Sequence, residues 1–221
     1  MFIGVSGLIG AGKSTLTRDL SKELSRLQGT PWNSVYEPVK ENPYLEDFYK
    51  DISRWTFNMQ LYLLASRFRQ HQEVIWDPAH RLGGGVVQDR TIYEDTIFAR
   101  MHKDDGLMSP RDWDTYISHF EIMKGFLRYP DVIIYLRVSP ELALERIESR
   151  ARPGEAGLVP LDYLKKLHDG YEKFVGEMTR YTMVIPLDWK DFRDTTEVAQ
   201  EILEKTSGES AQKFLRSLRR T

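Results

Sequence analysis

Eight residues near the amino end have the types and spacing of a phosphate-binding loop. Residues 7–14 read Gly-Leu-Ile-Gly-Ala-Gly-Lys-Ser, which satisfies the pattern G-x-x-x-x-G-K-[ST] at every fixed position. Glycines let backbone N–H groups approach a polyphosphate, Lys13 reaches the β- and γ-phosphates, and the Ser14 hydroxyl ligates Mg²⁺. The loop therefore predicts binding of a nucleoside triphosphate together with Mg²⁺.

Two further acidic residues stand where predicted strands end. Glu37 precedes Pro38 after a strand at 34–36, and it is either a base for the reaction or a surface carboxylate before a turn. Asp89 follows a strand at 86–88, where P-loop enzymes place a second metal-holding carboxylate. Arg90 beside it would neutralise charge on a transferred phosphoryl group. The alternative for Asp89 and Arg90 is a local ion pair that caps the next helix.

Polar residues at helical spacing are candidates for binding the rest of the ligands. Gln60 and Arg67 stand seven residues apart and therefore face the same way along a helix. They suit the hydrogen-bonding edge of a nucleobase, although exposed polar residues at this spacing are equally common. Arg146, Arg150 and Arg152 lead into a glycine-containing loop, which suits a lid over phosphates at about 146–160. The alternative for these arginines is a solvated basic helix end.

The elements that must position these residues alternate between strands and helices. Apolar patterns predict strands at 2–5, 34–36, 86–88, 131–138 and 183–187, and helices at 14–27, 52–74, 109–127, from 140, 161–181 and 195–205. This alternation predicts an α/β fold with a doubly wound five-stranded parallel sheet. The buried run Val-Ile-Ile-Tyr-Leu at 132–136 indicates a strand covered on both faces.

Composition narrows the class of protein. The chain has 221 residues, 41% hydrophobic content and a formal charge of −2, which predicts one domain over 1–221 and no nucleic-acid binding by the main body. The basic tail at 207–221 is expected to be a solvated, flexible end. The absence of cysteine excludes disulfides and thiolate catalysis. With a strand starting at residue 2 and no long apolar run, we expect a soluble cytoplasmic protein without a membrane partner.

Taken together, these motifs resemble the deoxyribonucleoside kinases of the deoxycytidine, deoxyguanosine and deoxyadenosine kinase group. The resemblance covers nearly the whole chain. It rests on the stretches 7–15, Glu37-Pro38-Val39, 48–51, the helix with Gln60 and Arg67, 89–95 and 135–152. It implies a P-loop kinase fold with an arginine-bearing lid, ATP as phosphate donor with Mg²⁺, a deoxyribonucleoside as acceptor, a role in nucleotide salvage and a homodimer.

The resemblance also implies roles on the acceptor side. Glu37 matches the general base that takes the proton of the 5′-hydroxyl, and Arg90 matches the arginine that holds this hydroxyl and the developing charge. Asp89 matches the metal-linked acid, a position where several relatives have Glu. Tyr49 and Glu155 match the pair that binds the sugar 3′-hydroxyl. Glu155 follows Pro153-Gly154 where the family usually has two acids after the last lid arginine, in a stretch one residue longer than usual.

The base and the donor have their own expected residues. Gln60 matches the glutamine that reads the base, with Phe57 as its aromatic neighbour, and Arg67 and Asp95 match the charged pair of members that accept cytosine or purines. The residues expected to hold ATP are Gly7, Gly10, Ala11, Gly12, Lys13, Ser14, Thr15, Arg146, Arg150, Arg152, Asp191 and Phe192, of which Lys13 is also counted as catalytic and Ser14 shares Mg²⁺ with Asp89.

Base preference and function class leave alternatives open. The stretches 42–44 and 92–95 are more similar to bacterial-type deoxyadenosine kinases than to cytidine specialists, which favours deoxyadenosine over deoxyguanosine, deoxycytidine or several bases. A GTPase switch is disfavoured because no D-x-x-G or N-K-x-D occurs in the chain. A nucleoside monophosphate kinase shares the fold and the lid but needs extra cations for the acceptor phosphate. A non-catalytic regulator would have no use for an acceptor-side base.

Overall fold

The structure of the protein is a computed structural model that describes residues 1–36, 42–150, 159–208, 211 and 217. Its centre is a parallel sheet of five strands, β1 (Phe2–Gly7), β2 (Trp32–Val35), β3 (Gly85–Asp89), β4 (Val132–Arg137) and β5 (Met183–Asp188). The strands are arranged in the order β2-β3-β1-β4-β5. The predicted number, places and parallel direction of the strands are confirmed.

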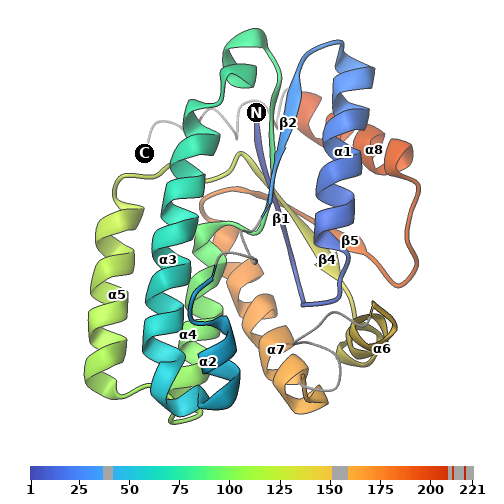
Figure 1. Cartoon of the computed structure of the whole chain (residues 1–221). Coiled ribbons are helices and arrows are strands. Elements are labelled where there is room, and N and C mark those ends of the chain that lie inside the picture. Colours follow the sequence, from blue (N-terminus) through green and yellow to red (C-terminus); the bar gives the residue numbers. More distant parts are fainter. Residues whose placement is uncertain (37–41, 151–158, 209–210, 212–216, 218–221) are drawn as a thin grey trace.

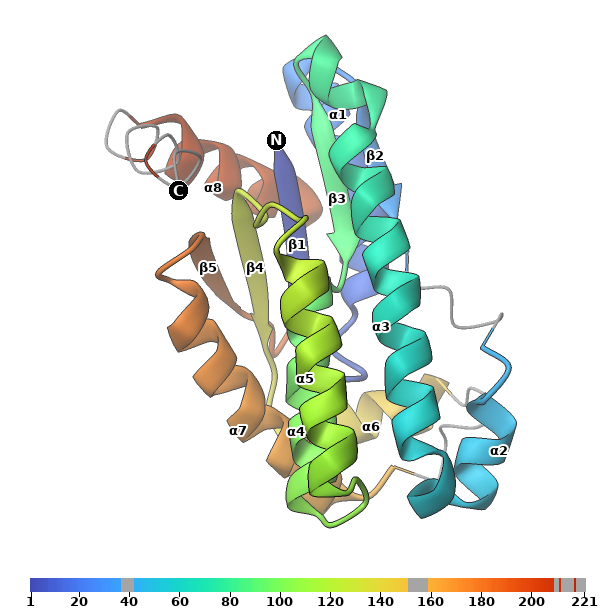
Figure 2. The ribbon, with the colours of Figure 1, turned by 90° about the vertical axis from the view of Figure 1, so that its left-hand side faces the viewer.

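Helices cover both faces of the sheet, as Figures 1 and 2 show. One face carries α1 (Lys13–Gln28) and α8 (Thr195–Ser207), which pack on each other. The other face carries α3 (Ile52–Trp76), α4 (Asp95–Asp104), α5 (Pro110–Lys124) and α7 (Leu161–Met178). Short elements complete the described part: α2 (Leu45–Lys50), α6 (Pro140–Arg150) and the 3-10 turns η2 (Pro78–Leu82) and η3 (Ile92–Glu94).

Burial explains why these segments form their elements. The side chains of β1 are all buried, and only the last residue of β4 is exposed, as expected for central strands covered by helices on both faces. In α1 the apolar repeat Leu16, Leu20 and Leu24 is buried against the sheet. Helix α5 begins as the sequence predicts, because the Ser109 hydroxyl accepts a hydrogen bond from the Asp112 amide at 3.1 Å.

Two helices and both 3-10 turns were not predicted. Helix α2 has six residues, too few for an apolar period to show. Helix α4 follows η3 directly and has no side-chain cap of its own, so no start signal marks it in the sequence. The turn η2 lies between the predicted helix at 52–74 and the predicted strand at 86–88. None of the described helices is long and apolar enough to cross a membrane.

Candidate active site

The predicted phosphate-binding loop lies between β1 and α1, at the carboxyl end of the sheet. Gly10 and Gly12 have φ angles of 84° and 89°, in the left-handed region that favours glycine. A Cβ atom on Gly10 would lie 2.5 Å from the Ala143 carbonyl oxygen of α6, so the close approach of α6 also requires glycine there. Because α1 begins at Lys13, the positive end of its dipole faces the loop.

Side chains of the loop have the arrangement needed around phosphates. Lys13 is buried, and its Nζ donates a hydrogen bond to the Leu8 carbonyl at 2.7 Å, which holds the ammonium group across the loop. Ser14 and Thr15 are exposed in the first turn of α1. Gly7 and Ala11 complete the loop, and the Ala11 amide donates to the Leu8 carbonyl at 3.1 Å. The loop is therefore held in a compact turn by hydrogen bonds to the Leu8 carbonyl.

The predicted metal-holding pair is brought together by the parallel pairing of β1 and β3. Val5 of β1 pairs with Asp89 of β3, so the acid lies beside the start of the loop. The Ser14 hydroxyl donates to Asp89 Oδ2 at 2.5 Å. Asp89 is buried, and its Oδ1 makes no hydrogen bond within the described part of the chain. A hydroxyl and a carboxylate with a spare buried oxygen are hard oxygen donors of the kind that Mg²⁺ prefers.

Arg90 occupies a special backbone position. Among the described residues it is the single non-glycine with a positive φ angle, 61°. Its amide donates to the Val5 carbonyl at 3.1 Å, which ties the turn after β3 to β1. Its guanidinium group is buried and lies over the Phe98 ring, 4.7 Å from the ring centroid. The turn at Arg90 therefore keeps the guanidinium group of this residue buried at the carboxyl end of the sheet.

The candidate base-reading residues are buried rather than solvated. Gln60 and Arg67 lie on α3 and are each 4% exposed, which excludes the interpretation of a solvated helix face. Arg67 forms an ion pair with Asp95, the first residue of α4, and both side chains are almost completely buried. The expected Arg67–Asp95 pair is therefore present. Near it Met59 is also buried, and the Asn42 amide nitrogen lies 2.9 Å from the Met59 sulfur.

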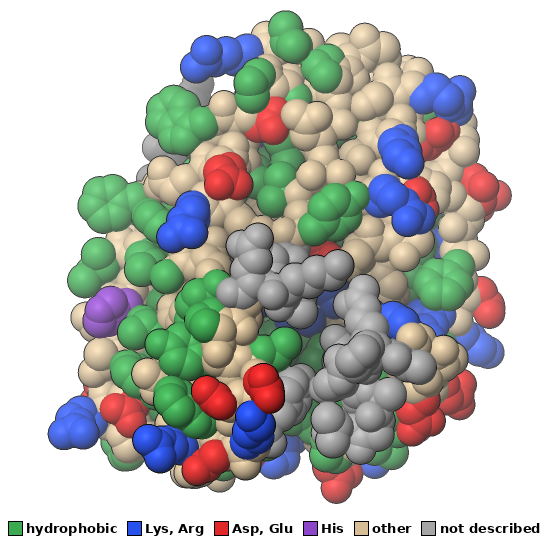
Figure 3. All heavy atoms as spheres, viewed as in Figure 1, with side chains coloured by type: hydrophobic (Ala, Val, Ile, Leu, Met, Phe, Trp, Pro, Cys, Tyr) green, Lys and Arg blue, Asp and Glu red, His purple; other side chains and the backbone are tan. Residues whose placement is uncertain are grey.

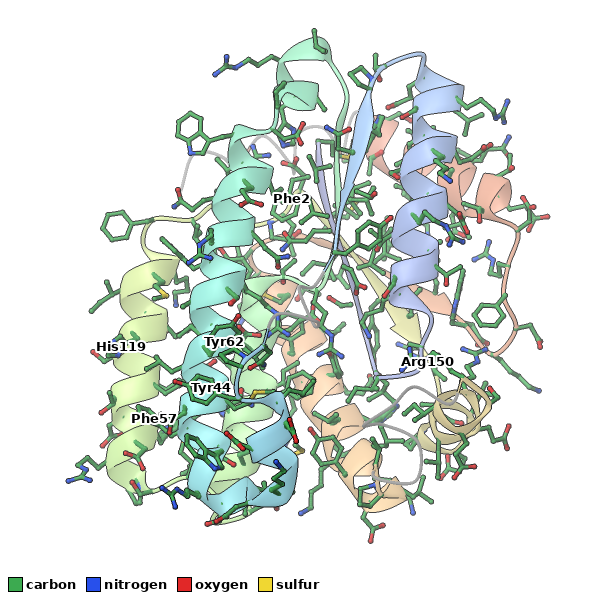
Figure 4. All side chains as sticks on the ribbon, viewed as in Figure 1. Phe2, Tyr44, Phe57, Tyr62, His119 and Arg150 are labelled. Carbon is green, nitrogen blue, oxygen red and sulfur yellow. The ribbon has the colours of Figure 1, made fainter. Side chains whose placement is uncertain are left out.

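Aromatic rings line the neighbouring part of α3. The rings of Tyr44 and Tyr62 have centroids 6.0 Å apart and lie side by side in Figure 4. Phe57, one turn before Gln60, is partly buried and packs against the main core. These rings form an aromatic cluster between α2 and α3.

The segment after β5 approaches the phosphate-binding loop from the other side. Arg146 of α6 donates hydrogen bonds to the carbonyl oxygens of Trp189 and Lys190, at 2.9 and 2.8 Å. Its guanidinium lies over the Phe192 ring at 4.4 Å, and burial lowers its pKa from the usual range. The Phe192 ring is exposed and stands beside the loop, 2.9 Å from where a Cβ of Gly12 would lie. Arg146 therefore holds this segment in place beside the loop.

Several of the predicted site residues lie outside the described part of the chain or are exposed at its surface. Glu37, Arg152 and Glu155 lie outside the described residues, as does the side chain of Tyr49, which belongs to α2. Arg150 is exposed at the end of α6, and Figure 4 shows it at the end of the molecule where the phosphate-binding loop lies. Asp191 is exposed next to Phe192. Most of the predicted tail also lies outside the described residues.

The sequence analysis did not single out Glu94, which is completely buried at this end of the sheet. Its carboxyl accepts hydrogen bonds from Ser6, the Thr91 amide and Tyr171. A signal for part of this arrangement is readable in the sequence, because Thr91-Ile92-Tyr93-Glu94 is a capping box, and the structure forms it. The contacts with Ser6 and Tyr171 join residues far apart in the chain and carry no local signal.

Comparison with known proteins agrees with this geometry. The model of one protein family, described as deoxynucleoside kinase, matches residues 3–209. A deoxyadenosine kinase of Dictyostelium discoideum is 46% identical over 200 residues, which cover 90% of this chain and 77% of that protein. A deoxyadenosine/deoxycytidine kinase of Bacillus subtilis (strain 168) is 44% identical over 176 residues, covering 78% of this chain and 76% of the relative.

Solved structures show the same fold. A deoxyadenosine kinase from M. mycoides with bound dCTP superimposes with a TM-score of 0.75 at 32% identity, covering 93% of this chain and all of that chain. The same enzyme with bound dATP gives a TM-score of 0.73 at 33% identity, covering 91% and 98%. The similarity in sequence and in structure therefore extends over most of the chain, including the elements that carry the site.

Proposed function

This chain belongs to the deoxynucleoside kinase family, and we propose that it transfers the γ-phosphoryl group of ATP to the 5′-hydroxyl of a deoxyribonucleoside. The observation that carries the proposal is the position of two distinct sets of residues at one end of the sheet. A phosphate-binding loop lies at the end of β1, and a buried Arg67–Asp95 pair joins α3 to α4 nearby. The first set suits a triphosphate, and the second suits a polar planar base.

The donor is held by the loop and Mg²⁺ in this proposal. Ser14 and Asp89 would hold the ion, which when bound neutralises charge on the phosphates. The described residues contain no cluster of three or more acidic, histidine or cysteine ligands, which fits an ion held by one or two protein groups and by phosphate oxygens. Lys13 would contact the β- and γ-phosphates, Arg146, Arg150 and Arg152 would contact the phosphates as lid arginines, and Asp191 and Phe192 would hold the adenine of ATP.

Proton removal and charge stabilisation fall to two residues of the acceptor side. Glu37 follows Tyr36, at the carboxyl end of β2, and we assign it the role of general base for the 5′-hydroxyl. A free glutamate has a pKa of about 4.3, so it is ionised at neutral pH and accepts the proton as the hydroxyl attacks. Arg90 would hold that hydroxyl and the charge that develops on the phosphoryl group. Tyr49 and Glu155 would hold the 3′-hydroxyl.

We propose deoxyadenosine as the preferred acceptor. The named relatives with 44% and 46% identity both act on deoxyadenosine according to their descriptions. A fixed Arg67–Asp95 pair offers hydrogen-bond donors and acceptors to a base edge, with Gln60 on the same face of α3. A mismatched base would leave a buried polar group unpaired, at a cost of about 1–3 kcal/mol.

We also propose that the enzyme serves nucleotide salvage. A further proposal is that the chain forms a homodimer through α5 and the adjoining end of α3. Ile122 in the last turn of α5 is 62% exposed, Phe126 just after this helix is 73% exposed, and Trp76 at the end of α3 is 70% exposed. Figure 3 shows hydrophobic side chains along the side of the molecule where α3 and α5 lie. Exposed apolar groups of this size favour association with another surface.

The test is a phosphoryl-transfer assay with ATP and each of the four deoxynucleosides, with their 5′-monophosphates as acceptors in parallel. The expected result is turnover with deoxyadenosine first or second in catalytic efficiency and none with monophosphates. Turnover only with monophosphates would identify a nucleoside monophosphate kinase. Nucleotide binding without any turnover would identify a regulator. Gel filtration of the protein and of its Phe126→Ser variant tests the dimer, which the variant is expected to weaken.

A further inference from the structure

Glu94 is a completely buried carboxyl group that joins three separate elements. Its Oε1 accepts hydrogen bonds from the Ser6 hydroxyl at 2.8 Å and from the Thr91 amide at 3.0 Å, and its Oε2 accepts one from the Tyr171 hydroxyl at 2.9 Å. Ser6 belongs to β1, and Tyr171 belongs to α7. Three donors to one buried carboxyl form a fixed arrangement, because moving any element breaks a buried hydrogen bond.

Two of the three donors lie next to residues of the site. Ser6 directly precedes Gly7, the first residue of the phosphate-binding loop, and Thr91 directly follows Arg90. The backbone of Arg90 is left-handed, a conformation that costs a non-glycine residue roughly 1 kcal/mol or more. Such a turn persists only when its surroundings hold it, and the Thr91 amide bonded to Glu94 is one of the contacts that do so.

The charges of two cationic residues of the site, Arg90 and Lys13, act on Glu94. Burial raises the pKa of Glu94, while the charges of Arg90 and Lys13 and the hydrogen bonds from Thr91 and Ser6 act in the opposite direction. Burial raises the pKa of Tyr171 well above its usual value, and the charge of Arg90 acts against this rise. Glu94 thus lies within the electrostatic reach of the two cations that we assign to the phosphoryl group.

We infer that Glu94 is a positioning residue for phosphoryl transfer, which holds the Arg90 turn and the first residue of the phosphate-binding loop in fixed register through its hydrogen bonds. The inference rests on the proposed kinase function, and it adds a residue without contact to substrate. Positioning of this kind matters because a shift of about 1 Å in a group that stabilises the transition state lowers turnover by about 10²-fold.

A purely structural role makes a different prediction. If Glu94 only filled the core, its variants would lose stability and leave the turnover of the folded enzyme unchanged. If it positions Arg90, its variants lower kcat more than they change the KM for the nucleoside, and the effect depends on Arg90 being present.

The experiment compares Glu94→Gln, Tyr171→Phe and Ser6→Ala in the full chain, with kcat and both KM values measured on folded protein. Glu94→Gln keeps the shape but replaces one carboxyl oxygen, an acceptor, by an amide group that donates, and Tyr171→Phe removes one donor. Tyr135→Phe is the matched control, because Tyr135 stacks on Tyr171 and donates its hydroxyl to Glu172 instead, at 2.9 Å. We expect kcat to fall about 10- to 100-fold in Glu94→Gln, 3- to 10-fold in Tyr171→Phe and Ser6→Ala, and less than twofold in the control.

A double-mutant cycle with Arg90→Lys separates positioning from a general loss of structure. We expect Glu94→Gln to have little further effect on kcat when Arg90 is already replaced. A Glu94→Gln or Tyr171→Phe enzyme with kcat within twofold of the parent overturns the inference, and so does a cycle in which the two effects add. A parent chain that phosphorylates none of the deoxynucleosides overturns the proposed function itself, so the two failures are distinguishable.

Discussion

Buried polar side chains have different kinds of hydrogen-bond partner at the two ends of the central sheet. At the amino end, buried polar side chains are bonded to backbone groups. Asp131 accepts from the Phe2 amide at 2.7 Å, Thr182 donates to the Pro130 carbonyl at 2.6 Å, and His71 Nε2 lies 2.8 Å from the Arg128 carbonyl oxygen. At the carboxyl end Lys13 also bonds to a backbone carbonyl, but several side chains bond to one another, as Arg67 does with Asp95 and Ser14 with Asp89.

The difference shows which end of the sheet is available for chemistry. A polar group bonded to backbone at a strand terminus satisfies a buried donor or acceptor and fixes the fold. Charged side chains bonded to one another retain lone pairs and protons that a ligand can share, and they adjoin the strained turn at Arg90 and the phosphate-binding loop. We therefore expect substitutions at the carboxyl end to alter turnover or base choice, with or without a loss of stability, and those at the amino end to alter stability alone.

The largest effect is expected from Glu37→Gln, which would remove the general base at the carboxyl end. Turnover should fall by roughly 10²-fold or more while nucleoside binding stays within about tenfold, because a glutamine still accepts a hydrogen bond but cannot take a proton. Steady-state kinetics and nucleoside titration measure the two quantities. Glu46→Gln, which alters an exposed carboxylate paired with Lys50 on α2, is the control. Parent-like turnover in Glu37→Gln would remove the assignment.

The Arg67–Asp95 pair at the carboxyl end affects both stability and base choice in our proposal. The pair is buried, and we assign it to the base site. Arg67→Met leaves the Asp95 carboxylate buried without its partner, and we expect the free energy of unfolding to fall by about 3–5 kcal/mol. Urea unfolding measures the loss. The double variant Arg67→Met with Asp95→Leu should regain most of this stability but not the preference among bases. Equal base preference in the double variant and the parent would separate the pair from recognition.

At the amino end, His71 predicts a stability change with pH that does not involve the site. Burial lowers its pKa from 6.5 to about 4 in the folded protein. The unfolded chain therefore binds an extra proton between these values, and stability falls as the pH drops from about 6.5 to about 4. The loss is on the order of 3 kcal/mol for this group.

The measurement is urea unfolding as a function of pH for the parent and for His71→Phe. We expect a shallower acid dependence in His71→Phe and the parental one in His119→Gln, which replaces an exposed histidine on α5 (Figure 4). His102, whose pKa burial also lowers to about 4, remains in both proteins and cancels in the comparison. An unchanged acid dependence in His71→Phe would show that this histidine is not the group responsible.

The smallest effect is expected from a stack of tyrosines of which two members, Tyr129 and Tyr181, lie just before β4 and β5. Tyr129 stacks on Tyr93 and on Tyr181, with ring centroids 4.4 and 4.7 Å away, and Tyr181 is 45% exposed. Tyr181→Ala removes the outer ring of the stack, which should cost about 0.5–1.5 kcal/mol of stability and leave turnover unchanged. Thermal unfolding and the kinase assay measure both. A marked fall in turnover would break the division between the two ends of the sheet.

The sequence determined the parts of this protein whose signals are local. The order of strands and long helices follows from apolar periodicity, and the phosphate-binding loop follows from residues within eight positions of one another. Ser109 and Pro110 marked the start of α5 in the same way. The short helix α2 was missed because six residues are too few to show a period. The roles expected from resemblance at Glu37 and Glu155 stay predictions.

The tertiary structure decided which of two readings of a polar residue holds. Sequence alone left Gln60 and Arg67 either solvated or in a site, and their burial beside Asp95 excludes solvation, because the partner comes from another helix. The hydrogen bonds of Glu94 join it to residues far away in the chain, because Tyr171 is 77 positions from Glu94 and Ser6 is 88 positions from it. Local patterns report backbone preference, whereas burial and pairing depend on which elements pack together. Only the folded chain therefore revealed the charged network behind the loop.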